Sequence, residues 1–229
     1  MEFQATDAAR YPLFDKVRHN HDIRVYIGAQ NLSLFSMGYT EHSFSHIGVV
    51  AERTGYILKT LGEDDHMIDL ALVAAWMHDL GNIINRVDHS QSGALMAFYL
   101  LDKMGVPAED IAPILCAIGN HDEGSGVPVS KLAAALIIAD KSDVRRSRVQ
   151  DEDQSHYDIH DRVNYSVTSS ILKINQEHTA IKLKLEIDTR YSEIGDYFEI
   201  FLERMLLCRK AANFLKMDFH LIINEQTMM

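Results

Sequence analysis

The chain has 229 residues, a net charge of −11 at pH 7, and 47% hydrophobic and 24% charged residues. This length and balance are typical of a folded protein with one large domain, or one domain plus a small appendage. The acidic charge argues against binding to nucleic acid polymers, which requires a dense Lys and Arg surface. A small anionic substrate stays compatible with it, because metal ions and a few local cations can reverse the field inside one cleft.

The two cysteines, Cys116 and Cys208, both lie in apolar helical patterns. A disulfide framework is therefore not expected, and a cytoplasmic location is the simplest interpretation. The first ten residues, MEFQATDAAR, lack the apolar run of a signal peptide. The apolar stretch 68–77 contains Asp69 and is too short to span a bilayer. We therefore expect a soluble protein without a membrane partner.

Residues 1–150 show helical periodicity. Apolar residues at three- and four-residue steps predict helices over 22–37 and 41–61. Over 68–80 nearly every face is apolar, which is typical of a central helix surrounded by others. Gly81 then supplies the left-handed residue that commonly ends a helix. Further helices are expected over 91–104, 108–118 and 131–144, the last with Ser130 as its N-cap.

The pattern changes after about residue 150. Residues 150–154 are polar and acidic, as in a linker or an exposed loop, and apolar and charged residues alternate over 181–188. This alternation predicts a strand with one buried face, preceded by a weaker strand over 167–175. A helix over 192–215 and a strand over 219–223 complete a β-β-α-β pattern. The expected fold is mainly α: a helical domain over residues 1–150 and a small α+β C-terminal subdomain over residues 151–229.

Polar groups stand at the ends of the most apolar helices. His78 and Asp79 end the helix over 68–80, and Asp140 lies at the inner end of another apolar run. Burying such groups is costly unless they are paired or bind a metal. His46 begins the helix that continues to residue 61, and His121 follows the helix over 108–118. Because each residue lies near a helix end, several helix ends can converge on one point.

Each of these residues also has an ordinary alternative. His46 could be a capping or core histidine, His78 and Asp79 a structural pair, and Asp140 with Lys141 a surface salt bridge. The conjunction of nitrogen and carboxylate groups is what favours a metal site. Such donors suit iron, manganese, zinc or nickel rather than calcium.

The series His46, His78-Asp79, Asp140 resembles the H…HD…D signature of HD-domain metal-dependent phosphohydrolases. The resemblance covers about residues 41–148, and the flanking residues also fit it: Val50-Ala51, Leu80-Gly81 and Ala139. It implies an all-helical core with a mono- or binuclear metal centre that hydrolyses phosphate esters or anhydrides.

His89 and His121 fall where two-metal HD proteins place a third and a fourth histidine. The resemblance then implies that Asp79 bridges two divalent ions. The first ion would be held by His46, His78, Asp79 and Asp140, and the second by His89, His121 and the other oxygen of Asp79. The alternatives are a loop histidine beside Asp88 and a solvated acidic turn around His121. His42, one helical turn before His46, could compete for its role, but the apolar phase after His46 fits the family better.

The implied mechanism is attack on phosphorus by a hydroxide whose pKa the metal ions lower. Asp79 and Lys141 are the expected catalytic residues. Arginine suits two-point contact with phosphate, so the candidate substrate-binding residues are Arg145, Arg146, Arg148 and, more weakly, Arg86. For each arginine alone, a solvated helix face or a subunit contact is about as good an interpretation.

We therefore expect a phosphohydrolase acting on a nucleotide or a small phosphorylated metabolite with two divalent transition metal ions. Two alternatives are kept: a di-iron oxygenase of the HD type, and a non-enzymatic nucleotide-binding sensor. The C-terminal subdomain carries no metal or nucleophile motif. We interpret it as a dimerising or lid-forming appendage, and expect a homodimer.

Overall fold

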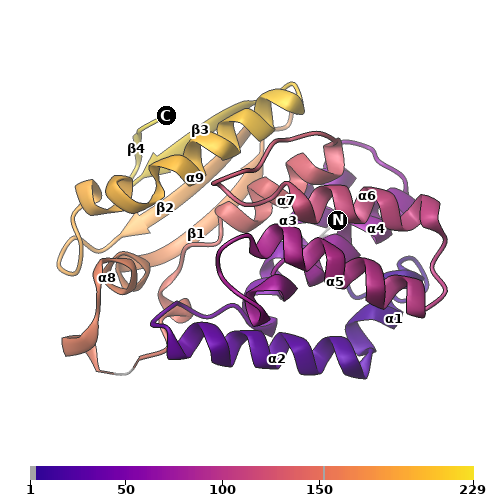
Figure 1. Ribbon diagram of the computed structural model, residues 1–229. Coiled ribbons are helices and arrows are strands. Elements are labelled where there is room, and N and C mark those ends of the chain that lie inside the picture. The colour runs from indigo at the N-terminus through magenta and orange to yellow at the C-terminus, as the bar shows by residue number, and fades with distance from the viewer. Residues whose placement is uncertain (1–3, 152) are drawn as a thin grey trace.

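Two helices built almost entirely of apolar residues form the centre of the helical part of the protein. They are α4 (Asp65–Met77) and α7 (Lys131–Lys141), and every α7 residue from Leu132 onward is buried. Helix α3 (Phe44–Thr60) packs against both. A helix without a polar face needs neighbours on all sides, and the surrounding helices supply them. The structure is a computed structural model that describes residues 4–151 and 153–229 (Figure 1).

The remaining helices of this half enclose the central three. They are α1 (Pro12–His19), α2 (His21–Ser36), α5 (His89–Lys103), α6 (Ala108–Gly119) and the 3₁₀ helix η1 (Leu80–Ile83). The helices expected from periodicity are all present. Two end earlier than expected: α4 stops at Met77 and α7 at Lys141. Ser130 caps α7 as predicted, since its hydroxyl accepts a hydrogen bond from Ala133 N.

Helix α1 is an addition that periodicity did not indicate. Its first amide groups point at Asp69 of α4, whose carboxylate accepts hydrogen bonds from Leu13 N at 2.9 Å and Phe14 N at 2.7 Å. The free N–H groups at a helix start need such acceptors. The carboxylate that stood out in the most apolar helix is therefore the N-terminal partner of α1.

The role expected for Gly81 is wrong. Its backbone does not have positive φ; the glycines that do are Gly38, Gly62 and Gly105. Gly81 lies inside η1, where a Cβ atom would sit 2.0 Å from the carbonyl oxygen of His89 and 2.6 Å from Gly93 N. Only a residue without a side chain lets η1 approach α5 this closely, and the approach brings His89 near Asp79.

The C-terminal half is a four-stranded sheet with one long helix. Its strands are β1 (Val167–Ile174), β2 (Ala180–Ile187), β3 (Asp218–Ile223) and β4 (Gln226–Thr227), in the order β1-β2-β3-β4. Strands β1 and β2 are antiparallel, whereas β2 and β3 are parallel and joined through α9 (Ile194–Phe214). The predicted β-β-α-β pattern is confirmed. The short elements η2 (Arg146–Arg148), η3 (Gln154–His156), α8 (Ile159–Ser166) and β4 were not expected.

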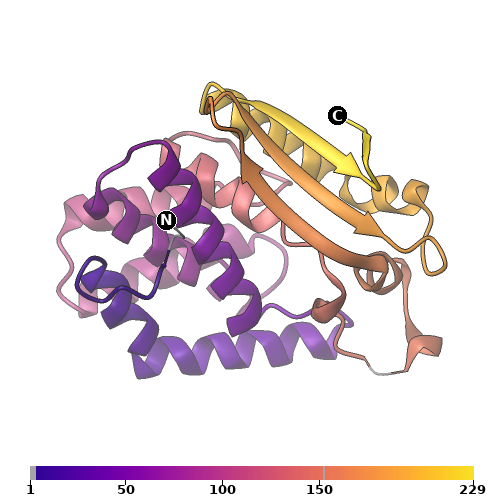
Figure 2. The ribbon, with the colours of Figure 1, turned by 180° about the vertical axis from the view of Figure 1, so that it is seen from behind.

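Helix α9 connects the two halves of the protein. It lies on one face of the sheet. In Figure 2, which is seen from the back of Figure 1, the strands lie in front of this helix. It also packs against α7 of the helical half. The division of the chain into two domains at residue 150 stays a prediction. The contact between α9 and α7 joins the segments before and after that residue. None of the helices in the described part of the chain is long and apolar enough to cross a membrane.

Replacing Gly81 with Ala tests whether the close approach of η1 to α5 stabilises the fold. We expect Gly81→Ala to lower the free energy of unfolding by about 1–3 kcal/mol or more, because the new methyl group overlaps backbone atoms. Gly28→Ala in α2 is the matched control, since nothing lies within 4 Å of its added Cβ; it should raise stability by about 0.5–1 kcal/mol. Urea unfolding measures both. Equal effects of the two substitutions would contradict this account.

Candidate metal centre

The ends of five helices meet at one buried point. His46 lies in the first turn of α3, His78 and Asp79 directly follow α4, and His89 begins α5. His121 follows α6 after one residue, and Asp140 lies in the last turn of α7. All six side chains are buried. The convergence expected from the sequence is therefore what the structure shows.

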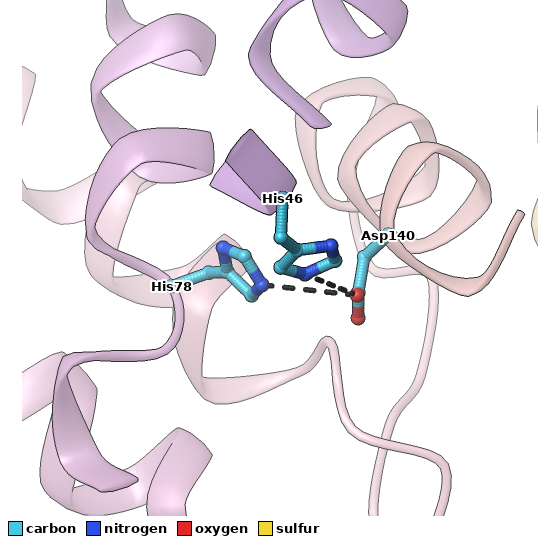
Figure 3. Close-up of side chains that lie close together, drawn as sticks. All are labelled: His46, His78 and Asp140. Atoms are coloured by element: carbon cyan, nitrogen blue, oxygen red, sulfur yellow. Dashed lines mark ion pairs between the residues drawn. The ribbon is translucent and has the colours of Figure 1, made fainter. Parts of the chain in front are cut away.

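The first group of side chains surrounds one oxygen of Asp140. Its Oδ1 lies 3.3 Å from His46 Nε2 and 3.8 Å from His78 Nε2 (Figure 3). Asp79 Oδ2 approaches the same two nitrogens, at 3.8 Å from His46 and 3.3 Å from His78. These four residues are the ones expected around a first metal ion.

The second group surrounds the other oxygen of Asp79. Its Oδ1 lies 3.6 Å from His89 Nε2 and 3.9 Å from His121 Nε2. The two Nε2 atoms are 3.2 Å apart. The Asp79 carboxylate therefore lies between two sets of histidines, with one oxygen toward each.

All four histidines turn the same ring nitrogen inward. Their Nδ1 atoms face outward to fixed acceptors: Ala75 O at 2.8 Å for His78, Arg86 O at 3.0 Å for His89, Ile118 O at 2.6 Å for His121, and Asp143 Oδ2 at 2.8 Å for His46. A carbonyl oxygen or the ionised Asp143 carboxylate only accepts, so Nδ1 carries the proton. In a neutral imidazole, the inward Nε2 then presents a lone pair.

Three of the inward atoms lack hydrogen-bond partners. His46 Nε2, His78 Nε2 and Asp79 Oδ2 are buried without a hydrogen bond within residues 4–151 and 153–229. Each such atom costs on the order of 1–3 kcal/mol. The lone pairs of His89 and His121 face each other, which is unfavourable unless a cation lies between them. Spacings of 3.2–3.9 Å suit atoms that share one ion about 2.0–2.2 Å from each.

Two overlapping groups of side chains meet the geometric requirement for a metal ion. One is His46, His78 and Asp140, and the other is His78, Asp79 and His121, with ligand atoms within 4.8 Å of one another in each. Their nitrogen and carboxylate donors fit a divalent transition metal. His78 belongs to both groups, so distance alone does not assign it to one ion.

The charge state of the cluster also suits a cation. Burial would raise the pKa of Asp79, but His78 beside it holds that pKa well below its usual range. Burial acts in the same direction on Asp140, and the ammonium of Lys141 outweighs it, so the pKa of Asp140 is also lowered. Burial lowers the pKa of His121 and of His89. Ionised carboxylates and neutral imidazoles are the forms that bind metals. Burial would lower the pKa of His78, but Asp79 beside it raises that pKa, so binding of an ion would displace a proton from His78.

Lys141 lies in a buried chain of charges behind Asp140. Its Nζ is 2.9 Å from Asp140 Oδ2 and 2.5 Å from Glu123 Oε2. The other oxygen of Glu123 accepts a hydrogen bond from Arg204 Nε at 2.9 Å. These contacts fix the orientation of Asp140. The catalytic role expected for Lys141 stays a prediction.

Three of the four candidate phosphate-binding arginines have other partners. Arg148 is buried and donates to the carbonyl oxygens of Glu41 and Asp143, while Arg145 donates to the Asp143 carboxylate. Arg146 donates to Tyr165 O and lies over that tyrosine ring. These contacts hold the segment after α7 in place on the outer side of His46. The geometry therefore gives no support to the three arginines as phosphate ligands.

Arg86 is placed differently from the other three. Its Nη1 lies 3.3 Å from His89 Nε2 and 3.2 Å from Asn82 Oδ1. It lines a cavity of about 430 Å³ beside the cluster. The same cavity is lined by side chains from both halves of the protein, including Tyr39, His42, Glu123, His160 and Arg204.

Sequence reasoning did not identify three residues of this site: Asn82, Asp143 and Arg204. Asn82 Nδ2 donates to Asp79 Oδ1 at 2.9 Å, and Asp143 orients His46. Two of them left a signal. Asp143 follows Asp140 by three residues, and Arg204 shares the buried helical face of α9 with Phe201 and Cys208, at spacings of three and four residues. A charge on that face needs a buried partner.

Comparison with known proteins finds a family model that covers the cluster and one similar relative. The family model "HD domain" matches residues 44–145, a range that includes all six clustered residues. The chain is 23% identical over 159 residues to an uncharacterized protein of Methanocaldococcus jannaschii, MJ1020, covering 59% of this chain and 61% of that protein. The chain thus spans about three fifths of that relative's length.

A solved structure also shows similarity. It is the crystal structure of a "predicted HD superfamily hydrolase" from an uncultured Thermotogales bacterium, with 26% identity and a TM-score of 0.44. The similarity covers 56% of this chain and 69% of that one.

Removing the acceptor behind His46 should weaken metal binding. We expect Asp143→Ala to lower metal affinity about 10- to 100-fold, because the His46 ring loses the carboxylate that orients it. A chelator-competition titration measures this, with circular dichroism to confirm folding. Asp102→Ala, on the exposed side of α5, is the control and should bind as the unmodified protein does. Unchanged affinity in a folded Asp143→Ala protein would contradict the orienting role.

Proposed function

Residues 44–145 of this chain belong to the HD domain family, and on that premise we propose that the protein is a metal-dependent phosphohydrolase. Its substrate would be a phosphate ester or anhydride of a nucleotide or a small phosphorylated metabolite. The observation that carries the proposal is the position of Asp79. Its two carboxylate oxygens face two separate histidine groups, an arrangement suited to a pair of divalent ions that share one bridging ligand.

In this proposal His78 is assigned to the first ion, and the other ligands divide by their distances to the two oxygens of Asp79. His46, His78, Asp140 and one oxygen of Asp79 would hold the first ion, and His89, His121 and the other oxygen of Asp79 would hold the second. When bound, such ions lower the pKa of a water molecule and offset the charge on phosphoryl oxygens.

The chain itself contributes orientation. Each histidine is fixed through Nδ1, Asn82 fixes Asp79, and Lys141 fixes Asp140. The donor atoms are therefore positioned before a substrate binds, which reduces the reorganisation that binding and reaction require. The apolar helices α4 and α7 exclude bulk water from the inner side of the cluster.

The cavity of about 430 Å³ is the proposed substrate site. Its volume lies within the range of about 300–1,000 Å³ that is usual for small-molecule pockets. Arg86, at its edge and near His89, is the arginine from the sequence-based set that supports this proposal. The homodimer expected from the sequence stays a prediction.

Removal of the bridging carboxylate tests the metal-dependent reaction. Asp79→Ala should lose bound metal and turnover together, because each oxygen faces a different histidine group. Elemental analysis gives the metal content, and phosphate release from a panel of nucleotides and small phosphate esters gives the activity. The exposed-site variant Asp102→Ala should keep both. If Asp79→Ala retained full metal content and full turnover, the proposal would be wrong.

The same panel separates the alternative functions. Metal-loaded protein that consumes oxygen with iron, yet releases no phosphate, would favour the oxygenase. Nucleotide binding without either reaction would favour a sensor.

The number of ions is tested at the second histidine group. His89→Ala and His121→Ala should each lower the metal content by about one ion per chain and leave the group around His46 loaded. Both variants should fold, because the two histidines lie at helix ends. A stoichiometry of one ion per chain in the unmodified, metal-saturated protein would overturn the two-ion assignment.

A further inference from the structure

The cavity beside the metal cluster is built by both halves of the chain. The helical half contributes Tyr39, His42 and Arg86, and the C-terminal half contributes His160 of α8 with Phe201 and Arg204 of α9. Helix α9 reaches the cavity because it packs against α7, the helix that carries Asp140 (Figure 1). The C-terminal half therefore takes part in the site directly.

Three contacts place this cavity against the cluster. The His42 ring packs edge-on against His46, with centroids 5.4 Å apart. Arg86 Nη1 lies 3.3 Å from His89 Nε2. Glu123 contacts Lys141, which in turn contacts Asp140. The residues that line the cavity thus contact the cluster, although the six donor side chains are not among them.

The Arg204 guanidinium group has a hydrogen-bond partner at Nε, whereas its two terminal nitrogens have none within the described residues. Its Nε donates to Glu123, and its guanidinium lies over the Phe201 ring at 4.7 Å from the centroid. Its side chain is 21% exposed to solvent. A guanidinium fixed in this way has little conformational freedom left to lose when it binds an anion.

Arg86 offers a second guanidinium from a different element. Its Nη1 is the atom that contacts Asn82 and His89, and among the described residues Nε and Nη2 have no acceptor. Its charge also lies near the Tyr39 ring, 5.8 Å from the centroid. Two guanidinium groups with open donors thus line one small cavity. Two carboxylates line it as well: Asp158, and Glu123, which is paired with Lys141 and Arg204.

We propose that Arg204 and Arg86 bind the terminal phosphoryl group of the substrate, so that α9 forms part of the substrate site. A terminal phosphoryl group has three non-bridging oxygens, enough for the metal centre and both guanidinium groups, whereas an internal diester has two. The preferred substrate class is therefore a phosphate monoester or the terminal phosphate of a nucleotide. This inference rests on the proposed function.

Binding of inorganic phosphate to the metal-loaded protein tests the inference by calorimetry. Arg204→Ala should weaken phosphate binding about ten- to a hundredfold, the range for loss of a charge-assisted contact. Arg204→Lys should recover only part of the affinity, because an ammonium lacks the planar two-point contact. Arg209→Ala, an exposed position on the same helix, is the matched control and should bind as the unmodified protein does.

Metal content and folding separate substrate binding from a structural role. Arg204→Gln keeps a donor for Glu123 and much of the side-chain volume, so it should fold and load metal normally while binding phosphate weakly. With a hydrolysed monoester, the Arg204 variants should raise KM more than they lower kcat. Variants that lose stability or metal, yet bind phosphate normally once loaded, would overturn the inference.

The two proposals fail in different ways. If the unmodified protein hydrolyses phosphate esters and binds phosphate, and the Arg204 variants do so equally well, only the role of α9 is wrong. If the unmodified, metal-loaded protein neither binds phosphate nor hydrolyses any ester, the phosphohydrolase proposal fails and this inference fails with it. Equal turnover of diesters and monoesters would overturn the assigned substrate class.

Discussion

The arrangement of this protein depends on burying six donor side chains, three of whose inward atoms (His46 Nε2, His78 Nε2 and Asp79 Oδ2) have no hydrogen-bond partner within the described residues. Nitrogen and oxygen atoms crowd within 4 Å of one another around Asp79. Left alone, they would destabilise the fold by desolvation and by repulsion of lone pairs. The apolar helices α4 and α7 oppose this cost, since their burial is nearly complete. Packing of the apolar core therefore holds the helix ends together although the polar atoms at those ends would destabilise this arrangement.

A second set of contacts makes this arrangement specific. Each histidine is fixed by the acceptor behind it, and the carboxylates are fixed by Asn82 and Lys141. For three of the four histidines this acceptor is the main-chain carbonyl three residues earlier, such as Ala75 O for His78 and Ile118 O for His121. The helix termini thus supply the orientation as well as the position of the donors.

Local signals in the sequence were enough to predict the cluster and most of the fold. A histidine or carboxylate at the end of an apolar helix is anomalous by itself, so His78, Asp79 and Asp140 could be found without knowing their neighbours. Alternation over 181–188 likewise predicted β2, because a strand with one buried face records its environment in its own pattern. Residues 1–3 and 152 lie outside the described part of the chain, and no expected site residue falls on them.

What could not be predicted depends on contacts between distant segments. Helix α1 is fixed by Asp69, more than fifty residues later. The basic residues after Asp140 looked available for phosphate, yet their direction is set by Glu41, Asp143 and Tyr165. A glycine after an apolar helix can serve either a left-handed turn or a close approach of two segments. For Gly81, only the position of α5 shows that it is the close approach.

The crossover between β2 and β3 has a consequence for the order in which the protein is assembled. All six cluster residues precede residue 141 in the chain, so a nascent polypeptide can gather them well before α9 is synthesised. Strand β3 must then pair in parallel with β2, a non-local step that closes slowly. Arg204 reaches the cavity only when α9 is docked between the sheet and α7. Under the proposed function, the metal ligands can therefore be gathered before the substrate cavity is complete, and a chain stalled between the two stages would have the ligand cluster without its complete cavity.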